Sequence, residues 1–134
     1  MLSKRYATTE INQIFSEIGR IEFERDLWIS VLKAQSTLGL EIPKKAVQSY
    51  QKARDNIDLQ IINEIELRTK HDVKARIEAY NQASGGYEFI HLGMTRRDLT
   101  DNVEQLQIKK ASKIILGKYV SILRHFIEKA DEYK

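Results

Sequence analysis

Residues 90–102, IHLGMTRRDLTDN, have the pattern of the entrance to one long helix. Thr95 is placed to cap that helix, and Asp98 is placed to return the second bond of a capping box. A helix entrance exposes unpaired backbone N–H groups and carries positive dipole character, which favours phosphates and carboxylates. His91 and the Thr95 hydroxyl are therefore candidates for holding an anionic group. The same residues also fit a structural role as caps and loop filler, and both interpretations stay open.

From Leu99 to Tyr133 the sequence predicts a single helix, roughly 50 Å long at about 1.5 Å per residue. Its apolar residues form two adjacent rows, which together make a face too broad for an ordinary surface helix. The first row is Ile108, Ala111, Ile115, Tyr119, Ile122, Phe126 and Ala130, and the second is Leu116, Val120, Leu123 and Ile127. We expect the distal part of this helix to pack against another chain or a further segment.

The residues before that helix carry helical periodicity and no convincing strand pattern, so we predict an all-α fold. Thr8 or Thr9 is expected to cap a first short helix. Further helices are expected over residues 21–38, 44–54, 58–67 and 69–83, with glycines at 39, 85 and 86 as breaks. The expected buried face of the 21–38 helix is Phe23, Leu27, Val31, Ala34 and Leu38.

Composition restricts the class of protein. The chain has 134 residues, of which 42% are hydrophobic and 31% charged, which is typical of one soluble domain. It contains no cysteine, which excludes disulfides and thiolate chemistry within it. No apolar run approaches the roughly 20 residues that span a bilayer, and the N-terminus lacks the apolar core of a secretory signal. We therefore expect a cytoplasmic protein that does not insert into a membrane.

The net charge of +3 arises from 22 basic and 19 acidic residues, which are interspersed along the chain. Nucleic-acid binders usually show a clear basic face. A DNA-binding helix–turn–helix around Gly39 is thus an alternative that the balanced charge disfavours, and we expect no nucleic-acid partner.

Two further groups of residues are candidates for chemistry. Residues 69–72, Thr-Lys-His-Asp, fit the Thr-x-x-Asp pattern of a capped helix start. A carboxylate beside an imidazole could also tune His71, but adjacent helical residues do not face one another, so capping is the favoured role of Asp72. Arg5 and Tyr6 supply a guanidinium and a phenol suited to phosphate. We identify no metal-ligand cluster and no nucleophile–base pair.

Taken together, the motifs resemble the adenylosuccinate lyases, a family of the fumarase/aspartase superfamily. The resemblance rests on Arg5-Tyr6, on residues 69–73 (Thr-Lys-His-Asp-Val) and on residues 90–102, in matching order and spacing over essentially the whole chain. The His-x-Gly-x-Thr block of residues 91–95 is shared more widely in the superfamily. The Arg-Tyr and Lys-His-Asp elements favour the adenylosuccinate branch.

The resemblance implies a β-elimination that releases fumarate from adenylosuccinate to give AMP in purine biosynthesis, with no cofactor and no metal. It implies that Arg5 and Tyr6 contact the nucleotide, that Lys70, His71 and Asp72 line the substrate site, and that His91 and Thr95 position the succinyl part. It also implies a homo-oligomer formed through the long helix. Residues 1–97 would form the N-terminal helical domain, and residues 98–134 the first long helix of a central helical bundle.

The chain departs from the family pattern in two respects. The family usually has serine after the threonine, where this chain has Arg96, which we include among the substrate-binding candidates. The family's catalytic histidine, in a Thr-His-Gly-like motif, is expected shortly after residue 134, and its catalytic serine lies later still. We therefore expect this N-terminal portion to hold substrate-binding residues but no catalytic residue, and to be inactive alone. A non-catalytic, lyase-derived oligomerisation or regulatory protein is the alternative.

Overall fold

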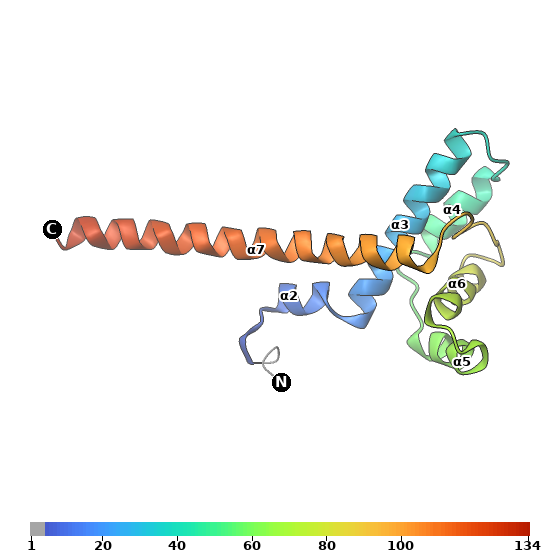
Figure 1. Ribbon diagram of the computed structural model, residues 1–134, viewed down its shortest axis with the longest axis horizontal. Coiled ribbons are helices and arrows are strands. Elements are labelled where there is room, and N and C mark those ends of the chain that lie inside the picture. The colour runs from blue at the N-terminus through green and yellow to red at the C-terminus, as the bar shows by residue number, and fades with distance from the viewer. Residues whose placement is uncertain (1–4) are drawn as a thin grey trace.

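The computed structural model describes residues 5–134, and the regular structure of that range is entirely helical, which confirms the predicted all-α class. The helices are α2 (Thr9–Ile14), α3 (Glu17–Thr37), α4 (Lys44–Lys52), α5 (Leu59–Thr69), α6 (Asp72–Ala83) and α7 (Arg96–Glu132). Figure 1 shows that α3 to α6 gather around the beginning of α7, whose second half extends away from them.

Local sequence explains where several helices begin and end. The Ser16 side chain accepts a hydrogen bond from the Gly19 N–H, so α3 begins before the predicted residue 21. The Asp58 carboxylate caps α5 by accepting from the N–H groups of Gln60 and Ile61. Gly39 follows the end of α3 and adopts a φ of 97°, which glycine tolerates better than other residues. The predicted helix break at this position is confirmed.

The core lies where α3, α4, α6 and the first turns of α7 meet. Its largest buried side chains include Trp28, Leu32, Tyr50, Tyr80 and Leu99. The Tyr80 hydroxyl donates to the Tyr50 carbonyl oxygen at 2.7 Å, so the phenol is not left unpaired in the core.

The predicted buried face of α3 is partly wrong: Phe23, Leu27 and Val31 are only half-buried, and Ala34 and Leu38 are exposed. Leu38 is 82% exposed, whereas the residues of α3 that are buried are Gly19, Ile21, Glu24, Arg25, Trp28, Ile29 and Leu32. Two charged residues lie within this stripe, and their presence shifts the apolar pattern away from the face that packs. Arg25 is tolerated there because its Nη1 donates to three carbonyl oxygens in the segment after α4, those of Ala53, Arg54 and Asn56.

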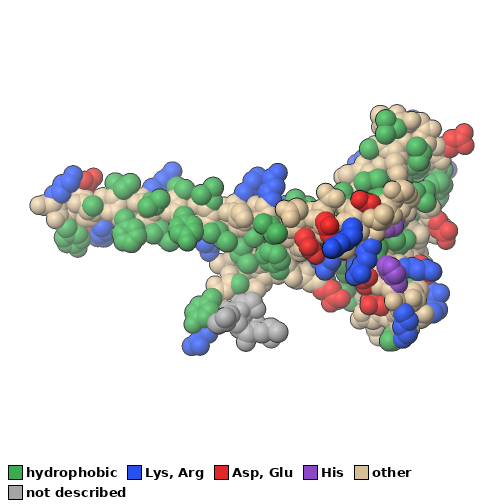
Figure 2. Space-filling model, viewed as in Figure 1, with side chains coloured by type: hydrophobic (Ala, Val, Ile, Leu, Met, Phe, Trp, Pro, Cys, Tyr) green, Lys and Arg blue, Asp and Glu red, His purple; other side chains and the backbone are tan. Residues whose placement is uncertain are grey.

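Helix α7 divides into a packed half and an exposed half. Up to Ala111 it packs against α3 and α2 through Leu99 and Val103, and the Gln107 amide donates to the Ile14 carbonyl oxygen at 2.7 Å. After Ile114 every residue of α7 is exposed. Figure 2 shows hydrophobic side chains along this extended part. The single long helix is therefore confirmed, and most of its two apolar rows lies uncovered within the described chain.

Among residues 5–134, no helix is both long and apolar enough to cross a membrane.

Candidate functional site

The entrances of α6 and α7 form the candidate site, because one ion pair joins them at the surface of the molecule, between Asp72 and Arg96. The α6 cap differs from the predicted Thr-x-x-Asp arrangement. His71 is the N-cap and its Nδ1 accepts from the Lys74 N–H at 3.2 Å, whereas Thr69 is the last residue of α5. The prediction failed because Lys70 turns the chain with a φ of 52°, which ends α5 immediately before the cap. Asp72 is consequently the first residue of α6 and its carboxylate is free for other partners.

The Asp72 carboxylate links the two entrances. Its Oδ2 lies 3.2 Å from Nη2 of Arg76 on the same helix and 3.2 Å from Nη2 of Arg96 on α7. Partial burial acts to raise the pKa of Asp72, but the Val73 N–H, Arg76 and Arg96 outweigh it, so the pKa lies below its ordinary value. Asp72 is therefore an ionised anchor with two cationic partners.

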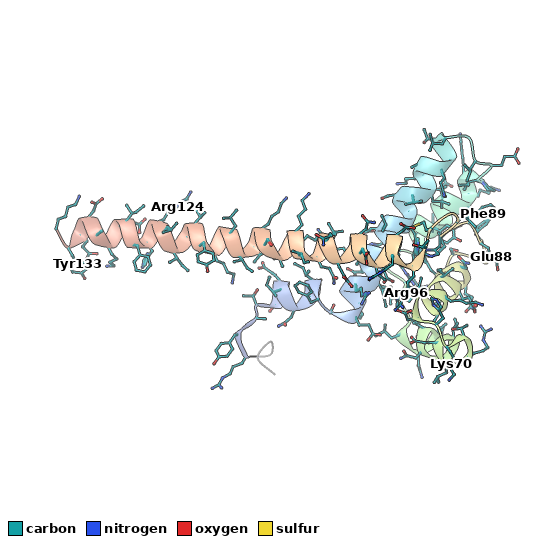
Figure 3. All side chains as sticks on the ribbon, viewed as in Figure 1. Lys70, Glu88, Phe89, Arg96, Arg124 and Tyr133 are labelled. Atoms are coloured by element: carbon teal, nitrogen blue, oxygen red, sulfur yellow. The ribbon has the colours of Figure 1, made fainter. Side chains whose placement is uncertain are left out.

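Arg96 is the first residue of α7. Figure 3 shows it at the end of α7 that lies close to α6. Pairing with Asp98 or Asp101 would have been the local solution for a cation at a helix entrance. Instead Arg97 pairs with Asp101 at 3.2 Å, and Arg96 reaches across to Asp72. The guanidinium thus lies between the two entrances, at the position where the resemblance to the family predicts the small hydroxyl of a serine.

His91 is fixed by the core. Its Nδ1 accepts a hydrogen bond from Nε1 of the buried Trp28 at 3.0 Å, so in the neutral imidazole the proton is on Nε2. Burial lowers the pKa of His91, and His71 lowers it further against the opposing effect of Asp98. His91 is therefore held neutral, with an Nε2–H available as a donor. The following loop is held by the Gln35 amide, which donates to the Leu92 carbonyl oxygen at 2.8 Å.

The predicted capping box of α7 is confirmed. The Asp98 N–H donates to the Thr95 hydroxyl oxygen at 3.4 Å, and the Thr95 N–H donates to the Asp98 carboxylate at 2.7 Å. The backbone N–H and the side chain of Thr95, both hydrogen-bonded to the Asp98 carboxyl, lower the pKa of Asp98. The Thr95 hydroxyl oxygen accepts the bond from the Asp98 N–H in this arrangement.

The other candidate residues lie apart from this cluster. Lys70 is exposed and lines a separate open cavity of about 530 Å³ with Asn63, Glu66 and Leu67 on α5. Arg5 and Tyr6 are exposed and stack on each other, with 5.7 Å between guanidinium carbon and ring centre. They precede α2, which Figure 1 places well away from α5 and α6. One copy of the chain therefore brings His71, Asp72, His91, Thr95 and Arg96 to one end of the core, but not Arg5 or Tyr6.

The sequence analysis missed three residues that contact the site residues from the core side. Trp28 bonds to His91, Arg76 pairs with Asp72, and Glu24 pairs with Arg76. Glu24 and Trp28 share the buried stripe of α3, at a spacing of four residues. That spacing was visible in the sequence, but a buried glutamate contradicts the rule that helical core faces are apolar.

The site is rich in hydrogen-bond donors. It offers the Nε2–H groups of His71 and His91 and the first backbone N–H groups of two helix entrances, while Arg96 is already paired with Asp72. Such a donor set suits an anionic ligand with more than one carboxylate or phosphate group. Residues 5–134 contain no group of three or more His, Cys, Asp or Glu side chains arranged to hold a metal ion.

Comparison with known proteins identifies relatives of this chain. It is 35% identical to adenylosuccinate lyase of Methanocaldococcus jannaschii over 134 residues, which cover 97% of this chain and 29% of that protein. It is 32% identical to adenylosuccinate lyase of Schizosaccharomyces pombe, over 99% of this chain and 28% of that protein. It is 30% identical to adenylosuccinate lyase of Archaeoglobus fulgidus, over 97% of this chain and 29% of that protein.

No protein-family model matches the chain. The relatives agree with the resemblance carried by the motifs, and the chain spans less than a third of their length. Along nearly its whole length, this chain is thus homologous to a segment of the adenylosuccinate lyases.

Proposed function

We propose that this chain supplies substrate-binding residues of an adenylosuccinate lyase, an enzyme that eliminates fumarate from adenylosuccinate to give AMP. The observation that carries the proposal is the cluster of His71, Asp72, His91, Thr95 and Arg96 at two joined helix entrances, in a chain matched over 97% of its length by a lyase of that name. These residues come from motifs far apart in the sequence, and their shared location supports a common ligand.

In this proposal the ligand's carboxylates bind at the entrances of α6 and α7. His91 donates from Nε2, the Thr95 side chain lies beside the ligand, and the first turn of α7 adds dipole stabilisation. His71 contacts the same ligand, while Asp72 holds the Arg96 cation in place. Lys70, which lines a separate cavity beside α5, contacts a more distant part of the substrate. Arg5 and Tyr6 contact the nucleotide, and because they lie apart from the cluster within one copy, they serve a site shared with a neighbouring subunit.

The rest of the proposal concerns assembly and activity. Helix α7 associates with other copies through its exposed apolar rows, as a part of a central helical bundle that begins near residue 98. Residues 1–97 form the helical domain that carries the site. The chain needs no cofactor, functions in the cytoplasm and has no lyase activity alone, because the acid and base of the family lie in other motifs.

The alternative is a non-catalytic role, in which the chain is a lyase-derived oligomerisation or regulatory protein. The long exposed half of α7 favours this role, since it offers a large apolar face without contributing to the site. Ligand binding discriminates the two, because an oligomerisation protein has no need of the donor cluster.

Titration of isotope-labelled chain with adenylosuccinate and with fumarate, followed by amide NMR, tests the proposal. We expect both ligands to shift the signals of residues 71–73 and 91–98, and expect His91→Ala to reduce the shifts. Gln60→Ala on the exposed start of α5 is the matched control. Saturating ligand without shifts at either entrance would contradict the proposal, and purified chain that cleaves adenylosuccinate would contradict the expected inactivity.

A further inference from the structure

A chain of ion pairs runs from the core to the candidate site. Glu24 of α3 is fully buried, and its Oε2 lies 2.6 Å from Nε of Arg76 on α6. Arg76 in turn reaches Asp72 through Nη2 at 3.2 Å, and Asp72 reaches Arg96 at 3.2 Å. Carboxylates and guanidinium groups thus alternate over three helices, from the interior to the entrance of α7.

Arg76 is suited to the middle of this chain because its two contacts use different nitrogens. Nε lies 2.6 Å from Oε2 of the buried glutamate, and Nη2 lies 3.2 Å from Oδ2 of Asp72. A planar guanidinium fixes the angle between two such partners, whereas a lysine ammonium is a single point charge on a flexible stem. The side chain is 12% exposed, so its position is set by protein neighbours rather than by water.

Stability alone does not explain why a carboxylate, and not an apolar side chain, is buried at position 24. A buried carboxylate costs several kcal/mol in lost hydration, on the order of the attraction that its partners return. Burial raises the pKa of Glu24 against the opposing effects of Arg76 and Arg20, whose Nε lies 3.5 Å away. Apolar residues of similar volume often replace such pairs without loss of stability. The cost of burying Glu24 has a reason if the Glu24–Arg76 pair fixes the orientation of a neighbouring functional group.

We propose that Glu24 and Arg76 are positioning residues, which lock the Asp72 carboxylate and through it hold the Arg96 guanidinium between the entrances of α6 and α7. This inference rests on the proposed function, since it assigns these residues to the same ligand site. Neither residue touches the ligand. Their effect on binding is indirect, because a freely rotating Asp72 no longer restrains Arg96 and leaves its carboxylate facing the incoming anion.

Two readouts test the inference on the 134-residue chain. The first needs no ligand and is the pKa of the Asp72 carboxyl, measured by carbon NMR. Arg76→Gln should raise it by at least about half a unit, because a neighbouring cation is lost. Arg76→Lys should retain part of this charge effect. The second readout is the affinity for fumarate, which Arg76→Lys and Glu24→Gln should each weaken at least threefold.

Glu78→Gln is the matched control. Glu78 is also on α6 and also pairs with an arginine, Arg68, but it has no contact with Asp72. It should leave both readouts unchanged. All comparisons are made at a temperature at which circular dichroism shows each variant to be folded, and Glu24→Gln, which conserves volume, remains the usable variant if Arg76→Gln does not fold.

The outcomes separate the inference from the proposed function. If Arg76→Gln leaves the pKa of Asp72 unchanged, or if Glu24→Gln and Arg76→Lys bind fumarate as tightly as the unaltered chain, the pair is only structural and the inference is overturned. If the unaltered chain does not bind fumarate, the proposed function is contradicted, and the pKa of Asp72 alone then decides whether Arg76 positions that carboxylate.

Discussion

The indole Nε1 of Trp28 donates a hydrogen bond to Nδ1 of His91 at 3.0 Å, and this bond couples the core to the candidate site. Trp28 is 1% exposed and its ring also packs edge-on against the imidazole, with ring centres 6.0 Å apart. His91 itself has a φ of 64°, an unusual backbone conformation for a residue with a side chain. The core therefore fixes both the tautomer and the direction of this histidine.

Replacement Trp28→Phe should raise the pKa of His91, because the indole N–H stabilises only the neutral imidazole. Burial holds that pKa below 6.5 in the folded chain. The contribution of His91 to the free energy of unfolding is consequently complete above the unfolded pKa of about 6.5 and is lost as the pH falls through the folded value. In the variant this pH dependence should shrink. Proton NMR titration measures the pKa, with the His125 signal as an internal control, and an unchanged His91 titration would contradict the assigned tautomer.

Two glycines should respond oppositely to alanine. A Cβ on Gly19 would lie 2.1 Å from the Gln13 carbonyl oxygen, so Gly19→Ala must separate α2 from α3, at a cost of about 1–3 kcal/mol. Gly117 lies within exposed α7 with no atom near its Cβ direction, and Gly117→Ala should stabilise the helix by about 0.5–1 kcal/mol. Urea unfolding measures both. Equal effects of the two changes would show that the α2–α3 contact does not form.

The exposed half of α7 should cause self-association, since large apolar patches on a soluble protein usually mark interfaces. Phe126 is 68% exposed and Leu123 is 59% exposed. Sedimentation velocity at several concentrations should show a dimer or a larger species, which Leu123→Glu with Phe126→Glu should dissociate. Arg124→Gln, on the same turn, should have no effect. A chain that remains monomeric at high concentration would show that α7 does not drive assembly.

Arg96→Ser should remove the cation that spans the two entrances. Because Arg96 is 60% exposed, its ion pair with Asp72 is screened by water and its loss should cost less than about 1 kcal/mol of stability. In a complete enzyme the smaller serine should leave more room for the succinyl group and raise kcat/KM at least about tenfold, equal to about 1.4 kcal/mol of transition-state stabilisation. Steady-state kinetics on the two forms measure this, and equal kcat/KM values would show Arg96 to be a bystander.

The fold was largely predictable because the helices follow local rules. The capping box of Thr95 and Asp98, the Asp58 cap and the break at Gly39 all act within a few residues, so their signals lie in short stretches of sequence. The buried face of α3 was not predictable in this way. Glu24 becomes buried only because Arg76, far along the chain, supplies its partner.

The same distinction applies to the site. Motifs predicted His71, His91 and Thr95 as neighbours of a ligand, which stays a prediction, and nothing local indicated that Arg96 would pair with Asp72 on another helix. The partner of His91 was equally hidden, because Trp28 meets it only after α3 packs beneath the α7 entrance. Contacts between distant elements decide both relationships, and helical periodicity carries no information on them.

Exchange of the matched segment of the Methanocaldococcus jannaschii adenylosuccinate lyase for this chain tests the central claim most directly. We predict that the chimeric enzyme, with Arg96 or with Arg96→Ser, cleaves adenylosuccinate to AMP and fumarate, and that His71→Ala or His91→Ala lowers kcat/KM at least about tenfold. A chimera that folds and assembles like the parent enzyme yet cleaves no adenylosuccinate in either form would contradict the assignment of these residues to a lyase substrate site.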